Sequence, residues 1–344
     1  MCGQTTPSAY HFPTINDQDV HGEVHTVHNQ AQRERERERM VNTVKIYKPL
    51  LRATMSFAGL RPEKIEVEPG TVMNIWAPTR SKKNANNSKK PAVVFLHGFV
   101  ADGILTWQFQ VLALARDYAV YVPDLLFFGG SSTGDGRRTV GFQAECLARG
   151  LAKLGVQQCT VVGFSYGAVV AFRLAELQPE LVESVVATCS GPVVTESLTR
   201  ECLERLRFPT WSEFLLPDSA SALKKLLEIG SFHFPRLPKC VFKHALEVIF
   251  DYRKERVELL EALVIPDEDF AFPRYPQKVH LVWGENDRIF PLEVAQSLKE
   301  NLGDNATLVC IEKAGHIVAV ERPFVYNKCL KKILASIYKA GHTK

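Results

Sequence analysis

One serine in the chain has the surroundings of a reactive nucleophile. The motif Gly-Phe-Ser-Tyr-Gly at 163–167 places Ser165 between a β-branched run, 159–162, and a helical stretch, 168–177. A serine on a sharp turn between a strand and a helix presents its hydroxyl to the positive end of the helix dipole. The flanking glycines let the backbone bend without a Cβ clash. This setting predicts a nucleophile elbow and acyl-transfer chemistry at Ser165.

A second Gly-x-Ser-x-Gly sequence occupies residues 130–134. It follows residues 123–129 and leads into 135–138, with no strand directly before it and no helix directly after it. Such a setting is typical of a loop. Ser165 is therefore the predicted nucleophile.

The hydroxyl of such a serine needs a base, and an imidazole base needs an acceptor that fixes its tautomer. In the elbow arrangement the acid and then the histidine follow the serine along the chain. His316, in an Ala-Gly-His sequence after a predicted strand, is the predicted base. The other histidines after residue 40 are weaker candidates. His97 lies in a glycine loop and His280 inside a predicted strand. His233 and His244 lie in a helical insertion, and His342 lies in the C-terminal tail.

Asp287 is the acid predicted to orient His316. It follows the predicted strand 279–283, at the end of the strand where catalytic side chains gather, and Glu285 is its nearest competitor. Asp124 also ends a strand, but it precedes the serine, so a structural role in a turn is expected. The position after the sixth strand, 190–192, holds no acid.

Two backbone N–H groups are predicted to form an oxyanion hole. His97-Gly98-Phe99 closes the apolar strand 92–96, and Tyr166 directly follows the nucleophile. The N–H groups of Phe99 and Tyr166 can both turn toward the reacting carbonyl oxygen. The His97 side chain is expected to hold the loop by hydrogen bonds.

The rest of the chain supplies the elements that position these residues. Two alternating segments, 64–68 and 72–76, flank Pro-Gly-Thr and predict a hairpin. After them, apolar strands alternate with helices, which favours a mainly parallel sheet covered by helices on both faces. The predicted strands of this part are 92–96, 119–122, 159–162, 184–189, 279–283 and 307–311.

Residues 191–275 break this rhythm. They contain no good strand, and their helical patterns lie at 195–206, 220–229 and 240–263. Their apolar and aromatic content suits a lid over a pocket, although most of the aromatic rings are expected simply to pack. The predicted organisation is a disordered tail (1–40), a first core part (41–190), a helical cap (191–275) and a second core part (276–344).

These motifs resemble the α/β-hydrolase superfamily over about residues 41–340. The resemblance rests on the His-Gly loop, the elbow, the late acid and the final histidine. Residues 101–107, 123–129 and 283–287 are similar to a plant branch described as lipase-, esterase- or epoxide-hydrolase-like. The resemblance to the superfamily implies an eight-stranded sheet, no cofactor, no metal, and a lid that sets substrate choice. It does not identify the substrate. Ala168 departs from relatives that carry a second glycine there.

The expected activity is hydrolysis of a lipophilic carboxylic ester, such as a monoacylglycerol, through an acyl-enzyme on Ser165. A carbon–carbon bond hydrolase or an acyltransferase could use the same three residues, and a slow-turnover ligand receptor could be built on the same fold. An epoxide hydrolase is disfavoured, because it needs a carboxylate where Ser165 stands.

Composition limits the partners. The chain of 344 residues is 46% hydrophobic and 23% charged, with a net charge of +4, which is ordinary for a soluble globular protein. No concentrated basic patch is visible, so nucleic acid is a poor expectation.

The 8 cysteines form no Cys-x-x-Cys pair, which favours a reducing compartment. No secretory signal and no apolar run long enough to span a bilayer is visible, so a cytoplasmic location is expected; the oligomeric state is left open.

The first 40 residues differ from the rest. They are polar and end in alternating Arg and Glu at 33–39, a composition typical of a disordered segment. His21, His25 and His28 have the spacing of one helix face, but nothing orders them, so no metal site is predicted. Met40 could be an alternative start that makes the tail dispensable.

Residues 41–59 form an amphipathic helical pattern with three basic residues, Lys45, Lys48 and Arg52. Such a helix could lie on a lipid surface. Packing of its apolar side on the domain is the expected arrangement.

Overall fold

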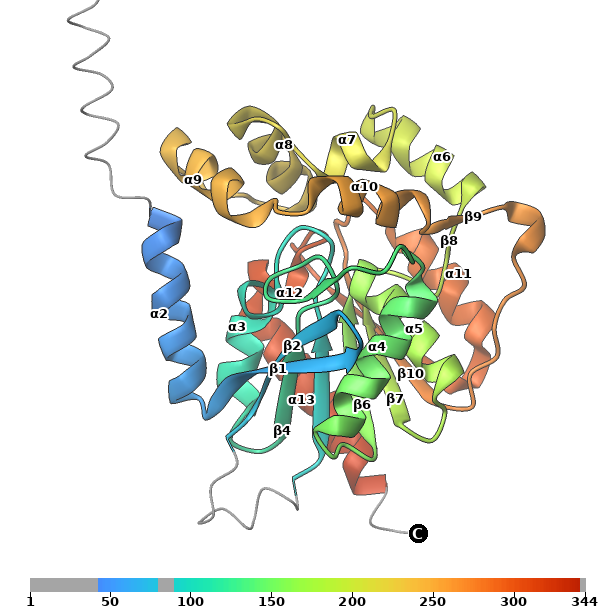
Figure 1. The fold of residues 1–344 in the computed structure, drawn as a ribbon. Coiled ribbons are helices and arrows are strands. Elements are labelled where there is room, and N and C mark those ends of the chain that lie inside the picture. The colour runs from blue at the N-terminus through green and yellow to red at the C-terminus, as the bar shows by residue number, and fades with distance from the viewer. Residues whose placement is uncertain (1–42, 80–89, 341–344) are drawn as a thin grey trace, which may run out of the picture. The chain divides into compact units, whose positions relative to one another are not determined.

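The computed structural model describes residues 43–79 and 90–340 (Figure 1), and the predictions for residues 1–40 lie outside them. The central sheet has nine strands among the described residues, one more than the resemblance implies, because the two-residue strand β5 (Ser132–Thr133) pairs with β2 (Thr71–Pro78). The other eight follow one path that does not keep their order in the chain. Their order is β1 (Leu60–Glu68), β2, β4 (Ala119–Pro123), β3 (Ala92–Leu96), β6 (Cys159–Phe164), β7 (Val182–Thr188), β10 (Lys278–Gly284) and β11 (Ala306–Ile311).

The strands from β4 to β11 pair in parallel, while β1 pairs with β2, and β2 with β4, antiparallel. The predicted hairpin is therefore present, and it is appended to a parallel sheet. Side chains in the central strands β3, β6 and β7 are almost entirely buried, as expected for strands covered on both faces.

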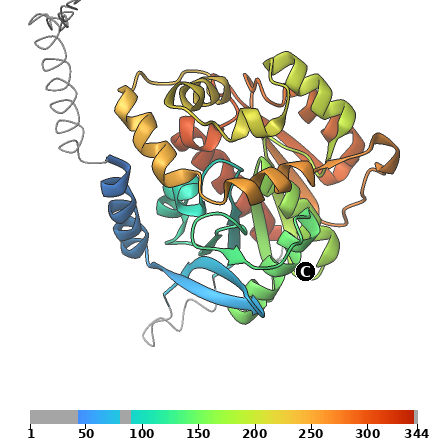
Figure 2. The same cartoon turned by 45° about the horizontal axis from the view of Figure 1, so that its top comes forward.

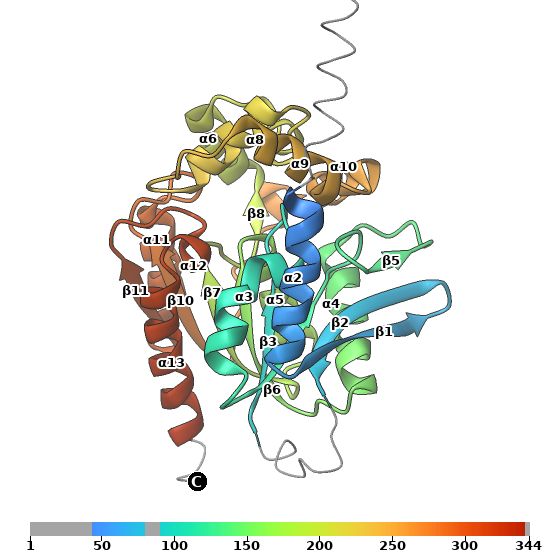
Figure 3. The ribbon, with the colours of Figure 1, turned by 90° about the vertical axis from the view of Figure 1, so that its left-hand side faces the viewer.

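Helices cover the sheet on both sides. On the face toward the viewer in Figure 3, α3 (Gly103–Leu114) packs with α12 (Val318–Glu321) and α13 (Pro323–Ala340). Elsewhere α4 (Val140–Lys153) packs with α5 (Tyr166–Leu177), and α11 (Leu292–Leu302) packs on β10 and β11. A short 3₁₀ helix, Gly303–Asn305, joins α11 to β11.

Helix α2 (Thr43–Phe57) lies beside α3 and packs one side on the core. Leu51 and Met55 are buried, and the ammonium of Lys48 lies 3.4 Å from the carboxylate of Asp102. The opposite side of the helix is exposed, so packing accounts for only half of its apolar pattern. Across residues 43–79 and 90–340, no helix combines the length and the apolar character needed to cross a membrane.

Five helices lie between β7 and β10 and form a layer above the sheet in Figures 1 and 2. They are α6 (Glu196–Leu206), α7 (Trp211–Leu215), α8 (Ala220–Gly230), α9 (Lys239–Ile249) and α10 (Arg253–Glu261). The single helical pattern expected at 240–263 is two helices, because the chain turns at Tyr252, whose φ is 53°.

Residues 191–275, where no good strand was expected, contain two strands of two residues each. Strand β8 (Val194–Thr195) pairs in parallel with β9 (Val264–Ile265), where the chain leaves the core and returns to it, and a 3₁₀ helix, Asp267–Asp269, follows. Strands of two residues are too short to show an alternating pattern in the sequence.

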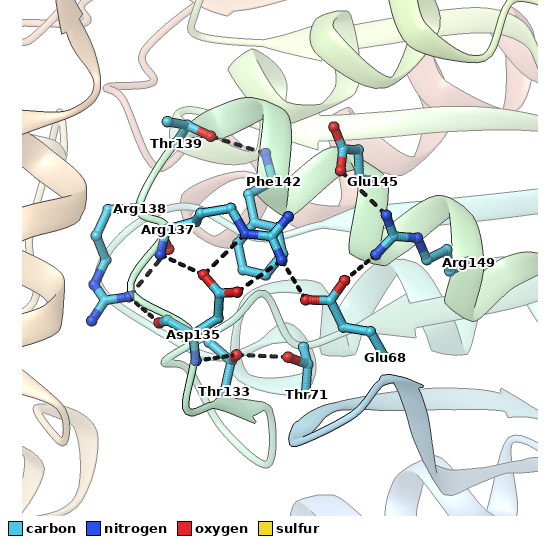
Figure 4. A network of polar contacts seen from close by, with 10 residues as sticks. All are labelled: Glu68, Thr71, Thr133, Asp135, Arg137, Arg138, Thr139, Phe142, Glu145 and Arg149. Carbon is cyan, nitrogen blue, oxygen red and sulfur yellow. Dashed lines mark hydrogen bonds and ion pairs between the residues drawn. The ribbon is translucent and has the colours of Figure 1, made fainter.

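Charged side chains tie the β1–β2 hairpin to α4 and to the loop that follows β5 (Ser132–Thr133) (Figure 4). Arg137 lies 2.6 Å from Glu68 and 2.8 Å from Asp135, and Glu68 also contacts Arg149 of α4. The next residue, Arg138, forms an ion pair of 2.7 Å with Glu258 of α10. This loop therefore joins the hairpin to the helical layer.

Candidate active site

Ser165 lies on a strained turn between β6 and α5. Its φ is 52° and its ψ is −121°, a conformation that costs a non-glycine residue about 1–3 kcal/mol. The glycines on either side make the turn possible, because a Cβ on Gly163 would lie 2.4 Å from the Gly167 carbonyl oxygen, and one on Gly167 would lie 2.4 Å from the Leu96 carbonyl oxygen. The predicted strand–turn–helix around Ser165 is thus observed.

His316 reaches the serine from the loop between β11 and α12. Its Nε2 lies 2.9 Å from the Oγ of Ser165, and its Nδ1 lies 2.7 Å from the Oδ2 of Asp287. The imidazole is 5% exposed and packs between the rings of Phe164 and Phe290. If Nδ1–H donates to the carboxylate, Nε2 is free to accept the serine proton.

Asp287 is held from its other side by the backbone. Its Oδ1 accepts hydrogen bonds from the N–H groups of Ile289, at 2.8 Å, and Phe290, at 3.0 Å. The competing carboxylate, Glu285, is exposed, while Asp287 is 5% exposed. The structure therefore brings Ser165, His316 and Asp287 into one hydrogen-bonded line and leaves Glu285 outside it.

Phe99, in the loop after β3, and Tyr166, the first residue of α5, flank the serine. Their rings meet edge to face with centroids 5.5 Å apart, and both residues line the cavity that contains Ser165. Tyr166 is the first residue of α5, so its backbone N–H has no acceptor in a preceding turn of the helix. Both N–H groups are thus carried by segments adjoining the serine, as an oxyanion hole requires.

His97 fixes the loop that carries Phe99. Its Nδ1 bonds to the Gly98 carbonyl at 2.7 Å, and its Nε2 accepts the N–H of Leu125 at 2.9 Å. Burial lowers the pKa of His97 to about 4, so the ring is neutral and can accept this hydrogen bond. The structural role expected for His97 matches these contacts.

Asp124 has a comparable role at the end of β4. Its carboxylate accepts hydrogen bonds of 2.9 Å from the N–H groups of Gly103 and Gly130 and from the amide of Asn74. Burial, reinforced by the charge of Asp102, raises its pKa to about 6 in spite of these donors. Ser131, in the second Gly-x-Ser-x-Gly sequence, donates to the Asp124 carbonyl at 2.7 Å, so it belongs to this turn. The following residues form β5, a short strand where only a loop was expected.

Two cavities meet at Ser165. The smaller, of about 40 Å³, is lined by Tyr166, Trp211, Leu260 and Leu263, among others. The larger, of about 200 Å³, extends between α3, α8 and α12 and is lined by Leu105, Leu226, Leu227, Ile317 and Val320, among others. Phe99, Leu215, Ile289 and His316 border both. Apart from Trp211, the walls supplied by the helical layer are aliphatic, so most of its aromatic rings pack elsewhere, as expected.

Glu321 is a residue that the sequence did not single out. Its carboxylate accepts the N–H of Gly315, at 2.7 Å, and those of Phe232 and His233, at 3.1 and 2.7 Å. It therefore ties the loop of His316 to the segment after α8. Gly315 lies far along the chain from Phe232 and His233, so no periodic pattern in the sequence indicates that Glu321 contacts both segments.

Arg256 of α10 was also missed. Its guanidinium is buried, with Nε donating to the carbonyl of Phe127 and Nη1 to that of Ile249, both at 3.0 Å. Burial lowers its pKa to about 10, which still leaves it charged at neutral pH. An arginine in a charged helical segment reads as a surface residue, and no local pattern reveals its burial.

Cys189 adds a thiol to the back of the site. It follows β7 with a φ of 52° and is fully buried; burial and the neighbouring Asp287 raise its pKa well above the ordinary value. Its Sγ, a carboxylate oxygen of Asp287 and a ring nitrogen of His316 lie within 4.8 Å of one another, the one such cluster of metal-ligand side chains among the described residues. Two of these three groups, His316 and Asp287, already make hydrogen bonds to each other, and His316 makes another to Ser165.

A model of the alpha/beta hydrolase family matches residues 93–328, well over half of the chain. The chain belongs to this family. Human epoxide hydrolase 4 is 25% identical over 271 residues, which cover 72% of this chain and 73% of that protein. Human monoacylglycerol lipase ABHD6 is 22% identical over 272 residues, which cover 74% of this chain and 78% of that protein.

Solved structures share the fold of this alpha/beta hydrolase at low identity. A membrane phospholipase A, described as a bacterial virulence factor, has a TM-score of 0.71 at 24% identity, over 94% of this chain and 99% of its own. A putative lipase from Acinetobacter baumannii has a TM-score of 0.72 at 21% identity, over 86% and 97%. The predicted α/β-hydrolase fold is confirmed. The relatives named here are human and bacterial, so the resemblance to a plant branch stays a prediction.

Proposed function

We propose that this alpha/beta hydrolase cleaves a lipophilic carboxylic ester through an acyl-enzyme on Ser165. The observation that carries the proposal is the line of hydrogen bonds from Ser165 through His316 to Asp287, at the junction of two apolar cavities. An activated serine beside apolar walls is suited to an acyl compound with little polar surface.

In the proposed reaction, the Oγ of Ser165 attacks the ester carbonyl carbon while Nε2 of His316 takes its proton. Asp287 accepts the Nδ1–H of His316 and stabilises the imidazolium that forms. The N–H groups of Phe99 and Tyr166 hold the tetrahedral oxyanion, and the loss of one such donor typically costs about 10²–10³ in rate. The imidazolium then protonates the departing alcohol, and water, deprotonated by His316, releases the acid from Ser165.

The substrate class follows from the cavity walls. Leu105, Leu226 and Leu227 extend the larger cavity away from the serine, which suits an alkyl or acyl chain. We assign residues 191–275 as the cap that sets this preference, between core parts at 41–190 and 276–344. The relationship to human monoacylglycerol lipase ABHD6 agrees with an ester of this kind.

The relationship to human epoxide hydrolase 4 suggests a different reaction, but that chemistry needs a carboxylate nucleophile, and the elbow holds Ser165. Three alternatives use the same serine: carbon–carbon bond hydrolysis, acyl transfer and slow turnover by a receptor. The products distinguish the first two from ester hydrolysis, and the number of turnovers distinguishes the receptor.

The test is hydrolysis of a series of p-nitrophenyl esters, from acetyl to long acyl chains, by the wild type and by Ser165→Ala. We expect many turnovers, faster for medium or long chains than for acetyl, and a loss on the order of 10⁴–10⁶ in the variant. Equal rates for all chain lengths would contradict a lipophilic substrate. Activity that survives Ser165→Ala, or a reaction that stops after one turnover, would overturn the proposed function.

A further inference from the structure

Helix α2 carries a stripe of apolar residues on its outer side. The stripe consists of Ile46, Leu50, Ala53 and Phe57, which are exposed and spaced so that they share one side of the helix. Phe57 is 90% exposed and Leu50 is 62% exposed. Since Leu51 and Met55 already pack this helix on the core, the outer stripe serves no packing in the described chain.

A second group of exposed apolar side chains surrounds α12 and the start of α13. It comprises Val320, Phe324 and Val325, with Phe109 and Leu112 of α3 and Phe232 after α8. Hydrogen bonds join these segments, because Asn327 donates to the Phe109 carbonyl and Glu321 accepts the N–H of Phe232. Phe324 is 88% exposed.

This second group continues into the cavity of the site. Val320 is exposed at the surface and also lines the larger cavity that reaches Ser165. Its neighbour Ile317 and the last residue of α8, Gly230, line the same cavity. An apolar path therefore leads from the surface group toward the serine.

Helix α2 and residues 232–243 and 318–331 are basic, while α3 carries no charged residue. Helices α2 and α3 and residues 232–243 contain no Asp or Glu, and the sole acid in 318–332 is Glu321, whose carboxylate accepts three backbone N–H groups. Exposed cations lie in these segments: Arg52, Arg236, Lys239, Lys243, Lys328 and Lys331. The sequence did not reveal this concentration, because it arises from three separate segments. Figure 3 shows α2, α3, α12 and α13 on one side of the molecule.

We propose that this docking face, formed by α2, α3, residues 232–243 and residues 318–331, binds the surface of an anionic lipid bilayer. Exposed Leu and Phe side chains insert between the lipids, and the surrounding cations bind acidic headgroups. The membrane then delivers a lipophilic ester to the larger cavity, a step that rests on the proposed function. A second copy of the chain is a poorer occupant, since a two-fold interface would oppose two basic faces.

The experiment is co-sedimentation of the full chain with vesicles of phosphatidylcholine alone and with about 30% phosphatidylserine. We expect binding to the anionic vesicles that weakens at high salt. The double variant Leu50→Ser, Phe324→Ser should lower the partition coefficient at least about tenfold. The matched control is Phe270→Ser, which removes an exposed ring outside the docking face and should bind like the wild type.

Hydrolysis of a water-soluble short ester, measured on the same proteins, should be unchanged in the double variant. The proposal is overturned if the wild type ignores both kinds of vesicle, if the double variant binds as well as the wild type, or if light scattering shows a dimer that the double variant dissociates. Vesicle binding by a protein without ester turnover would instead overturn the proposed function and leave the docking face in place.

Discussion

The guanidinium carbon of Arg256 lies 4.2 Å from the centroid of the Phe128 ring. Phe128 in turn meets His97, at a centroid distance of 5.0 Å, and Phe99, at 5.3 Å. A residue of α10 is thereby in direct contact with the aromatic group that supports the loop of Phe99. The helical layer and the proposed oxyanion hole are thus joined by two consecutive side-chain contacts.

Replacement of Arg256 should reveal this connection. Arg256→Met keeps much of the side-chain volume but leaves the carbonyls of Phe127 and Ile249 without their donor, so we expect the free energy of unfolding to fall by about 3 kcal/mol. Loosening of the Phe99 loop should also lower kcat by about tenfold. Urea denaturation and ester kinetics measure the two effects. Lys254→Met, an exposed position on the same helix, is the control; if both variants behave alike, Arg256 does not support the loop.

The identity of the acid can be tested with two neighbouring carboxylates. Asp287→Asn keeps the contacts to the backbone N–H groups in part but cannot stabilise the imidazolium of His316, so kcat should fall by about 10³–10⁴ without loss of the folded state. Glu285→Gln should change kcat by less than about twofold, because Glu285 is exposed. Circular dichroism checks that both variants are folded, and ester kinetics measure kcat. A larger fall in kcat for Glu285→Gln than for Asp287→Asn would make Glu285 the acid that orients His316.

The signals that place Ser165, His316 and Asp287 in one hydrogen-bonded line are local in the sequence. The strand, turn and helix around Ser165 are contiguous, and the acid and the histidine each follow a mainly apolar strand. Since parallel strands end at one edge of the sheet, their order in the chain suffices to bring the three residues together.

What the sequence could not predict depends on contacts between distant segments or on very short elements. The Arg256 bond to Phe127 spans 129 positions in the chain, and the residue occupies a segment that reads as charged and exposed. The helix α7 and the strands β5, β8 and β9 are only two to five residues long, so they carry no measurable periodicity. Tertiary contacts decide their conformation.

The larger cavity is expected to hold the longer chain of the substrate. Leu227 of α8 lines this cavity, and Leu227→Trp should fill part of it. We therefore expect KM for long-chain esters to rise about tenfold or more while acetyl ester hydrolysis stays close to the wild-type rate. Val294→Trp is the contrast, because Val294 lines a third cavity, which shares Ser190 and Phe290 with the smaller cavity but no residue with the larger one. A loss of long-chain activity in Val294→Trp alone would place the chain there.

The stability of the protein should depend on pH through His97. Its pKa in the folded state is about 4, below the usual value of about 6.5. Between these two values the unfolded chain binds a proton that the folded chain does not, so the free energy of unfolding falls as the pH falls from 6.5 to 4. The contribution of His97 over this range is roughly 3 kcal/mol, and it is fully present above pH 6.5.

His97→Gln removes this titration while keeping a side chain that can accept the N–H of Leu125 and donate to the Gly98 carbonyl. Urea denaturation of both proteins at pH 7.5, 6, 5 and 4 measures the difference between their free energies of unfolding. Asp124, whose pKa is raised to about 6, acts in the opposite direction, but it is present in both proteins and drops out of the difference. We expect the wild type to lose stability relative to His97→Gln as the pH falls through this range. A difference that is independent of pH would show that His97 is protonated in the folded protein as readily as in the unfolded one.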